Sequence, residues 1–412
     1  MTVHPIIAAL KWHKAGVLLI VLQIALTLAI VSNAIFIISQ RISVIQRPTG
    51  VVERDLFRVS QSFVGAPSGD DPASLDKLDA LQLADLGILR QLPDVQSVAA
   101  SDGMPLQGSI WVGGLALTAD QKTPTSAAGL YYGDEHMRST LGARLVAGRD
   151  FNAGEILHHT INSTVPSPVI IVSQALADKL YPHGDALGKT VYLDSKPTVI
   201  IGIVDRLQVA NASTRPWVYM SVMAPVRLDG VNANYVVRAK PGRLLPAMQA
   251  ARKALFAANR MRVMPDSWGI QSLTEIRDKA YRADRGMALL MGLICLILLG
   301  VTAAGIVGLT SFWVGQRHRQ IGIRRALGAR RIDILHYFHA ENLLIAGVGV
   351  VVGAMLARGL NVWLMTQYEM ARLPVTYMVT GVLAMLAIGQ VAVFVPARRA
   401  SLVPPVVATR AA

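Results

Sequence analysis

Four long segments of the chain are apolar and nearly free of charged side chains. A helix needs about 20 such residues to cross the ~30 Å hydrocarbon core of a bilayer. The first two segments contain no Asp, Glu, Lys or Arg, and the third carries only Glu341 and Arg358, one near each end. This pattern predicts four transmembrane helices, at residues 15–38, 286–316, 336–364 and 373–395. The first is too long for a signal-peptide core and no small-residue cleavage pattern follows it, so we expect it to be retained.

The stretch between the first two segments has the composition of a soluble domain. Residues 40–285 hold 27 Lys or Arg and 23 Asp or Glu, although only 16% of the whole chain is charged, against about 25% in soluble domains. Short β-branched runs bounded by turn residues predict strands at 168–172, 198–204 and 234–237, and helical patterns occupy roughly 72–92, 174–180 and 244–259. The expected fold is a membrane protein with four transmembrane α-helices and a large mixed α/β domain, residues 39–285, inserted between helices one and two. Two lobes are expected in it, with a lobe in 75–165 inserted into the other.

The distribution of Lys and Arg predicts which way the helices cross. The segment 317–335 contains six arginines and one acid, Asp333, whereas the 365–372 connection pairs Glu369 with Arg372. Short loops rich in Lys and Arg stay in the cytoplasm. We therefore expect residues 1–14, 317–335 and 396–412 inside, and 39–285 and 365–372 outside. The net charge of +14 is explained by this bias, and nucleic-acid binding is not expected.

Two further patterns concern the helices. Ser272 and Glu275 fit a capping box, which predicts a helix that starts near residue 273 and continues unbroken into the second span. Small residues recur every four positions in the second and third spans, where they permit close helix approach within one chain or between two. They are Gly300, Ala304, Gly308, Gly349 and Gly353.

Three motifs resemble the MacB/FtsX-type family of ABC permeases. Residues 172–181, 186–191 and 199–204, preceded by the sequence Gly-Arg-Asp-Phe at 148–151, are similar to the periplasmic domain of that family. Residues 319–329 look like its cytoplasmic loop, with Gln320 where the family usually has Glu. Residues 396–400, with Pro404 and Arg410, resemble its C-terminal ending.

The resemblance implies that the cytoplasmic loop couples to a separate ABC ATPase. The residues also permit this role, because Ile323, Ala326 and Leu327 fall at i, i+3 and i+4 and would share one helical face. A basic loop that merely obeys the positive-inside rule is the alternative, but it does not account for the apolar residues. The predicted ATPase-coupling residues are Arg319, Gln320, Ile321, Gly322, Ile323, Arg324, Arg325, Ala326, Leu327, Gly328 and Ala329.

The resemblance further implies a non-catalytic permease subunit of the bacterial inner membrane, without a cofactor of its own. The expected partners are cytoplasmic ATPase subunits, a second identical or sister permease chain, membrane lipids and, as a further candidate, a periplasmic adaptor. Movement of the outer domain would then extrude a substrate. A membrane regulator that transmits ATPase motion to an outer enzyme without transport is the second hypothesis. The residues identify neither a substrate nor a substrate-binding site.

Several weaker signals have simpler structural explanations. The segment 184–190 has three residues between its glycines where a phosphate-binding loop needs four, so a structural turn is expected. His158 and His159 are adjacent, and His336 and His339 lack the further ligands that a closed metal shell requires. No nucleophile motif occurs. We therefore predict no catalytic residue and no metal site.

Overall fold

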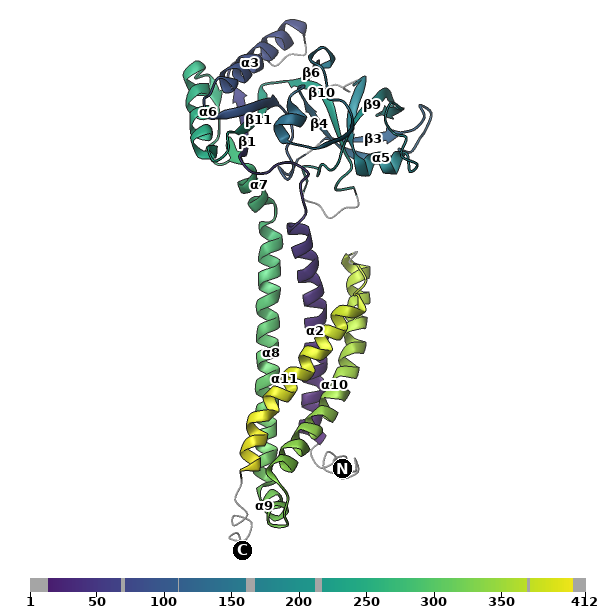
Figure 1. The fold of residues 1–412 in the computed structure, drawn as a ribbon, viewed down its shortest axis with the longest axis vertical. Helices are drawn as coiled ribbons and strands as arrows, with labels where there is room; N and C mark the ends of the chain where they lie inside the picture. The colour runs from purple at the N-terminus through teal and green to yellow at the C-terminus, as the bar shows by residue number, and fades with distance from the viewer. Residues whose placement is uncertain are drawn as a thin grey trace. The chain divides into compact units, whose positions relative to one another are not determined.

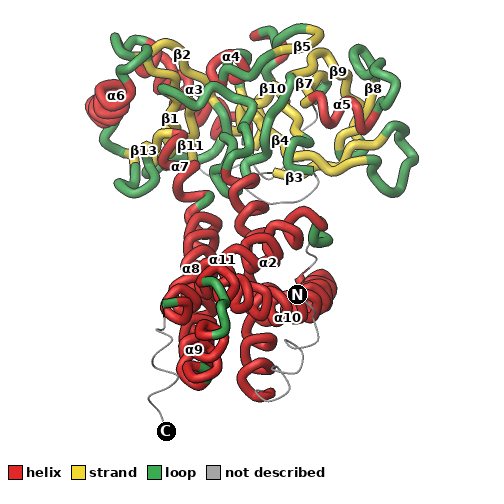
Figure 2. Tube along the Cα trace, turned by 60° about the horizontal axis from the view of Figure 1, so that its bottom comes forward, coloured by secondary structure: helices red, strands yellow, loops and turns green. Residues whose placement is uncertain are grey.

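The computed structural model describes residues 14–67, 71–109, 111–160, 167–211, 217–368 and 371–402. The predicted N-terminal segment, except for Lys14, and the tail residues Pro404 and Arg410 lie outside these ranges. The chain divides into two compact units, one formed by Met1–Ile45 with Ala283–Ala412 and the other by Gln46–Arg282. Figure 1 names their helices and strands, and Figure 2 shows that the strands belong to the second unit.

The first unit contains four helices that are long and apolar enough to cross a membrane. They overlap the four predicted segments, so the existence of these helices is confirmed, although their ends differ from the predicted bounds by several residues. Their bounds are α2 (Lys14–Ile45), α8 (Arg282–Gln316), α10 (Arg331–Tyr368) and α11 (Val375–Ser401). A short helix, α9 (His318–Ala326), lies between α8 and α10 in the sequence.

Glycines let α2 and α10 approach closely. A Cβ atom built on Gly349 would lie 2.9 Å from Ile24, and one on Gly353 would lie 2.9 Å from the carbonyl oxygen of Ala25. The predicted small-residue face of the third span therefore packs within this chain. On α8, by contrast, Gly300 and Gly308 have no atom of the described residues within 4 Å of such a Cβ.

Polar side chains of α2 bond to its neighbours. Gln23 donates to the carbonyl oxygen of Val301 on α8 at 3.0 Å, and Asn33 donates to that of Ala357 on α10 at 3.1 Å. Such bonds satisfy polar groups that lipid cannot. Gln23 and Asn33 therefore serve packing between the membrane helices.

The second unit contains two lobes built on separate sheets. The first lobe has a five-stranded sheet in the order β12-β1-β11-β2, with β13 also paired to β1. Its helices α3 and α6 cover this sheet, and buried Leu86 and Leu255 belong to the shared core. The elements are β1 (Leu56–Phe63), α3 (Pro72–Arg90), β2 (Val95–Ala100), β11 (Asn232–Ala239), α6 (Leu244–Ala258), β12 (Arg262–Val263), β13 (Ile270–Ser272) and α7 (Leu273–Ala280).

The second lobe has an eight-stranded sheet in the order β4-β3-β8-β9-β7-β10-β6 with β5 paired to β9. Because β10 also pairs with β4, the first six of these strands form a closed ring. The elements are β3 (Trp111–Ala116), β4 (Ser126–Gly133), β5 (Leu145–Gly148), η1 (Ala153–Glu155), β6 (Leu157–Thr160), β7 (Val169–Ser173), α5 (Gln174–Leu180), β8 (Thr190–Leu193), β9 (Lys196–Val204) and β10 (Ser221–Asp229). The short helix α4 (Met137–Leu141) follows β4 in the sequence but packs against β2 and β11 of the first sheet.

The predicted bounds of the inserted lobe were wrong. The insertion runs from β3 to β10, and not over 75–165, because β2 pairs with β11 of the first sheet. The helix α3 belongs to the first lobe as well, where Leu86 and Leu89 join the core beneath it. The general expectation of one α/β lobe inserted into another is confirmed.

The predicted capping box at the start of α7 is confirmed, but the helix is not continuous. The Ser272 hydroxyl accepts from the Glu275 amide at 3.1 Å, and the Glu275 carboxylate accepts from the Ser272 amide at 2.9 Å. The helix then ends at Ala280. Tyr281 has φ −102° and ψ 11°, outside helical geometry, and α8 begins at Arg282.

A buried ion pair lies in the core of the first lobe. Arg262 donates to both carboxylate oxygens of Asp85 at 3.0 Å, and the two side chains are 1% and 2% exposed. Gln61 and Tyr235 donate to the same carboxylate. This network joins β1, α3, β11 and β12. Because the site is buried, removing one partner would leave an unpaired charge there at a high cost in free energy.

Replacing Arg262 with Met should therefore lower the free energy of unfolding by about 3–5 kcal/mol, since Asp85 would remain as an uncompensated buried charge. Arg144→Met is the matched control, because Arg144 and Asp205 form an exposed pair worth about 1 kcal/mol or less. Urea titration of the purified protein, followed by proteolysis of the unfolded fraction, measures both. Equal losses in the two variants would contradict the assignment.

Candidate functional site

The predicted coupling segment folds as the short helix α9 followed by a tight reversal. Gly328 has φ +96°, a left-handed conformation that favours glycine after a helix. The amides of Gly328 and Ala329 donate back to the carbonyl oxygens of Arg325 and Arg324 at 3.2 and 3.0 Å. The Asp333 carboxylate then accepts from the Arg330 amide at 2.9 Å. These contacts end α9 and set the start of α10.

The two sides of α9 differ in exposure. Ile321 is only 5% exposed and belongs to the core that is shared with α8, α10 and α11. Ile323 is 46% exposed and Leu327 is 83% exposed, with Ala326 exposed between them. The predicted apolar face is therefore present, and it points away from the core of its own unit.

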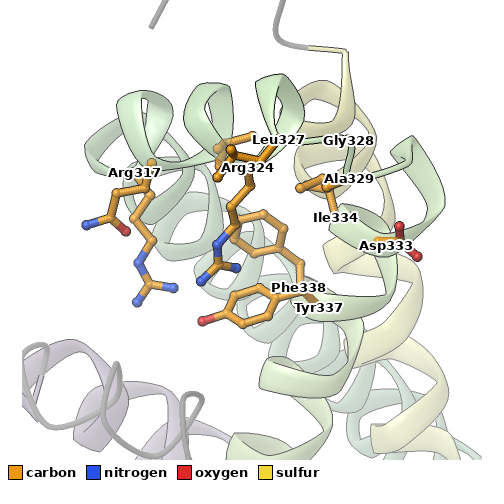
Figure 3. A pocket seen from close by; sticks show the side chains of 11 residues that line it. Arg317, Arg324, Leu327, Gly328, Ala329, Asp333, Ile334, Tyr337 and Phe338 are labelled. Carbon is orange, nitrogen blue, oxygen red and sulfur yellow. The ribbon is translucent and has the colours of Figure 1, made fainter. Parts of the chain in front are cut away.

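A groove of about 450 Å³ lies between α9 and the first turns of α10. Figure 3 shows Arg317 and Arg324 beside the ring of Tyr337, with Leu327 and Gly328 at the opposite end of α9 from Arg317. The guanidinium carbon of Arg324 lies 5.0 Å from the centre of the Tyr337 ring, an arrangement that stabilises the cation. The lining residues are Arg317, Gln320, Ile321, Arg324, Leu327, Gly328, Ala329, Asp333, Ile334, Tyr337 and Phe338.

One wall of the groove is held by a buried ion pair. Arg317 donates to both oxygens of Glu341 at 3.1 and 3.0 Å, and the side chains are 11% and 3% exposed. The pair connects the residue before α9 to Glu341, which lies within one turn of the groove on α10. The charge of Glu341, inside the third apolar segment, is thus paired with Arg317.

The structure brings most of the predicted coupling residues to this region in different ways. Six of them line the groove. Arg325 instead donates to the carbonyl oxygen of Ser401 at the end of α11, at 3.1 Å. Arg319, Ile323 and Ala326 are exposed. The part of the groove that α10 lines was not predicted from the sequence. Its residues Ile334, Tyr337 and Phe338 nevertheless fall at i, i+3 and i+4, the spacing of one helical face.

The groove combines apolar surface with positive charge. Its arginines can donate paired hydrogen bonds to carboxylates or phosphates, and its apolar part can bury an aliphatic or aromatic side chain. The nearby His339, considered above as a metal ligand, instead has Nδ1 2.6 Å from Oε1 of Gln390. The arrangement fits the docking of an acidic, partly apolar protein surface.

A second arrangement lies at the end of α7, inside the second unit. Arg277 donates to Glu53 at 2.6 Å and to the carbonyl oxygen of Arg47 at 2.8 Å. The fully buried Tyr281 has its hydroxyl 3.1 Å from Nε2 of Gln208. These contacts fasten the chain entering the unit, at residues 46–53, to the chain leaving it.

Comparisons with known proteins decide the family. The family model for the MacB-like periplasmic core domain matches residues 15–255, and that for the FtsX-like permease C-terminal region matches residues 292–405. The chain belongs to the MacB/FtsX-like family of ABC transporter permeases. It is thus a multi-pass membrane protein, and its family works with ABC ATPase partners.

Individual relatives are distant. The chain is 26% identical over 352 residues to "Macrolide export ATP-binding/permease protein MacB" of Neisseria gonorrhoeae, covering 84% of this chain and 51% of that protein. It is 24% identical over 298 residues to "Uncharacterized ABC transporter permease YvrN" of Bacillus subtilis, covering 70% and 71%. The chain thus spans about half or less of the length of the MacB relatives it matches.

A solved structure is also similar. The periplasmic region of MacB from Actinobacillus actinomycetemcomitans aligns with 57% of this chain and 97% of its own, at 15% identity and a TM-score of 0.35.

The Arg317–Glu341 pair should hold α9 in place. In Arg317→Gln, the two hydrogen bonds to the buried carboxylate are lost, and bonds to charged groups contribute about 1.5–3 kcal/mol. We expect the backbone amides of α9 to exchange with deuterium about tenfold faster or more. The exposed Arg319→Gln is the control and should leave exchange unchanged. Equal exchange rates in Arg317→Gln and the wild type would show that the pair does not order α9.

Proposed function

We propose that this chain is the permease subunit of an exporter in the bacterial inner membrane, driven by separate cytoplasmic ABC ATPase subunits. The observation that carries the proposal is the exposed apolar face of α9 beside an arginine-lined groove. The face lies on a nine-residue helix between two membrane helices, where a protein partner would meet both at once. In this proposal the chain itself hydrolyses no ATP.

The proposed orientation places both termini and α9 in the cytoplasm and the second unit outside. The arginines of 317–335 support this direction because positively charged short loops remain inside. In this orientation the groove faces the compartment that holds ATP. The two-lobed unit faces the other side of the membrane, where the substrate would be handled.

Docking would place Ile323 and Leu327 in an apolar pocket of the ATPase, with Arg324 and neighbouring arginines around it. Apolar contacts at the centre and charged contacts at the rim are the usual division in protein interfaces. Two permease chains, identical or paired with a sister chain, would be required to meet the two subunits of an ATPase dimer.

Motion would pass from α9 along the membrane helices. The Arg317–Glu341 pair ties the start of α9 to α10, so a displaced α9 moves the ends of α8 and α10 together. Just before α8 in the sequence, Arg277 bonds to residues 47 and 53, so the segment that enters the second unit is connected to the segment that leaves it. ATP-driven closure of the ATPase would thereby drive movement of the outer unit and extrusion of a substrate.

The alternative is a regulator that transmits the same motion to an outer enzyme without transport. The match to the MacB-like periplasmic core domain over residues 15–255 favours the transporter. A periplasmic adaptor would be an additional partner of the transporter.

Ile323→Asp should weaken binding of the ATPase by about 30-fold or more, because a central apolar contact of an interface is worth about 2 kcal/mol or more. Co-purification with candidate ABC ATPase subunits, and ATP hydrolysis in lipid nanodiscs, are the measurements. Membrane insertion should be unaffected.

His318→Asp is the matched control, because His318 is exposed and lies on the opposite side of α9 from Ile323 by helical geometry. It should bind the ATPase as the wild type does. Undiminished association of Ile323→Asp with the ATPase would refute docking through this face. If ATP hydrolysis were lost despite that normal association, Ile323 would act in a step that follows binding of the ATPase.

A further inference from the structure

Three potential metal ligands meet between α3, β6 and β10 of the second unit: Asp79, His158 and Asp229. Nδ1 of His158 lies 3.2 Å from Oδ1 of Asp79 and 3.6 Å from Oδ2 of Asp229. One ligand atom from each residue lies within 4.8 Å of the other two. Tetrahedral Zn²⁺ with bonds of about 2.0–2.1 Å requires ligand atoms about 3.3 Å apart. The two separations that involve His158 bracket this value.

Asp229 supplies an independent reason to expect a cation. Its side chain has no exposed surface, and neither carboxylate oxygen has a hydrogen-bond partner among the described residues. A buried carboxylate is costly unless it is paired or coordinates a metal. Nδ1 of His158 lies 3.6 Å from Oδ2 of Asp229, which is an ion pair when the imidazole is protonated but is longer than a good hydrogen bond. Both carboxylate oxygens thus lack a hydrogen-bond partner among the described residues, and the charge that faces them from the cluster is that of a protonated His158.

Of the two carboxylates, Arg227 forms an ion pair with that of Asp79. It donates to Oδ1 of Asp79 from Nε at 3.0 Å and from Nη2 at 2.8 Å, and Nη2 also lies 3.0 Å from Nε2 of His158. A metal on Nδ1 leaves the imidazole proton on Nε2, so Nη2 must turn away from it. The bond from Nε can persist, and it would orient Asp79 as an outer-sphere partner does in metal sites.

We propose that Asp79, His158 and Asp229 bind one divalent transition-metal ion, with Zn²⁺ as the best match and water in the fourth position. One imidazole and two carboxylates suit Zn²⁺, whereas Ca²⁺ takes six to eight oxygen ligands and Mg²⁺ takes an octahedron of oxygens. Sequence analysis set His158 aside together with its neighbour. The two histidines lie on strand β6, where consecutive side chains point to opposite faces, and only His158 joins the cluster.

The site would connect the two lobes of the outer unit. Asp79 belongs to α3 of the first lobe, and His158 and Asp229 belong to the sheet of the second lobe. The ion would add a bond between lobes that otherwise meet here through the Arg227–Asp79 pair and the bond from Gln82 to the carbonyl oxygen of Leu228, at 2.9 Å. The inference does not depend on the proposed transport function.

Metal binding to the full-length protein tests the proposal. The protein is purified in detergent without a polyhistidine tag and stripped with a chelator. It is then titrated with Zn²⁺ in the presence of a fluorescent competing chelator. We expect one ion per chain. His158→Ala and Asp229→Asn should each bind Zn²⁺ about 10- to 100-fold more weakly or worse, since loss of an outer-sphere partner alone costs that much.

His159→Ala is the matched control on the same strand and should bind Zn²⁺ as the wild type does. Titration of the wild type with Co²⁺ needs no variant, and visible absorption of a four-coordinate site should appear and saturate at one ion per chain. The proposal is overturned if the wild type shows no such absorption, or if its Zn²⁺ affinity is unchanged in folded Asp229→Asn. It is also overturned if His158→Ala and His159→Ala lose affinity equally.

Discussion

A lipid bilayer offers no hydrogen bonds to a peptide group, and this constraint governs the first unit. Each of its four long helices satisfies its backbone internally, so the connections between them are where other surfaces can be presented. The connection between α8 and α10 is the notable one, because it folds as α9 and leaves Ile323 and Leu327 exposed. The buried Ile321 on the opposite side fixes that orientation. One face of α9 therefore packs into the core of its own unit, and the opposite face is exposed to a partner.

Two sets of side-chain contacts would carry motion in the proposed mechanism. Near α9, Arg317 and Glu341 pair where water is scarce, so that separating them would leave a charge unpaired. In the second unit, Arg277 and Tyr281 contact residues near the point where the chain enters the unit and residues of its interior. The break at Tyr281 confines the stiff part of α8 to 35 residues. In the proposed mechanism, motion would thus pass through the side-chain contacts of α7 inside the second unit as well as through α8 itself.

The sequence predicted what depends on local pattern. The four apolar segments, the capping box at Ser272 and the apolar face of α9 all follow from neighbouring residues. Contacts between distant residues were not predictable. The pairing of β2 with β11, which moved the lobe boundary, joins residues more than 130 positions apart. Asp79, His158 and Asp229 likewise meet only because α3 packs against β6 and β10. Tyr281 was missed because its departure from helical geometry accompanies burial and contacts with Arg277 and Gln208.

The most direct test of the whole account is the direction in which the chain crosses the membrane. The native Cys295 is replaced with Ala, and single cysteines are introduced at the exposed residues Asp120 and Arg319. Intact cells are then treated with a membrane-impermeant maleimide. In cells whose outer barrier admits the reagent and whose inner membrane is intact, the proposed orientation predicts labelling at position 120. Position 319 should be labelled only after the inner membrane is opened. Labelling of position 319 from outside, or protection of position 120, would contradict it.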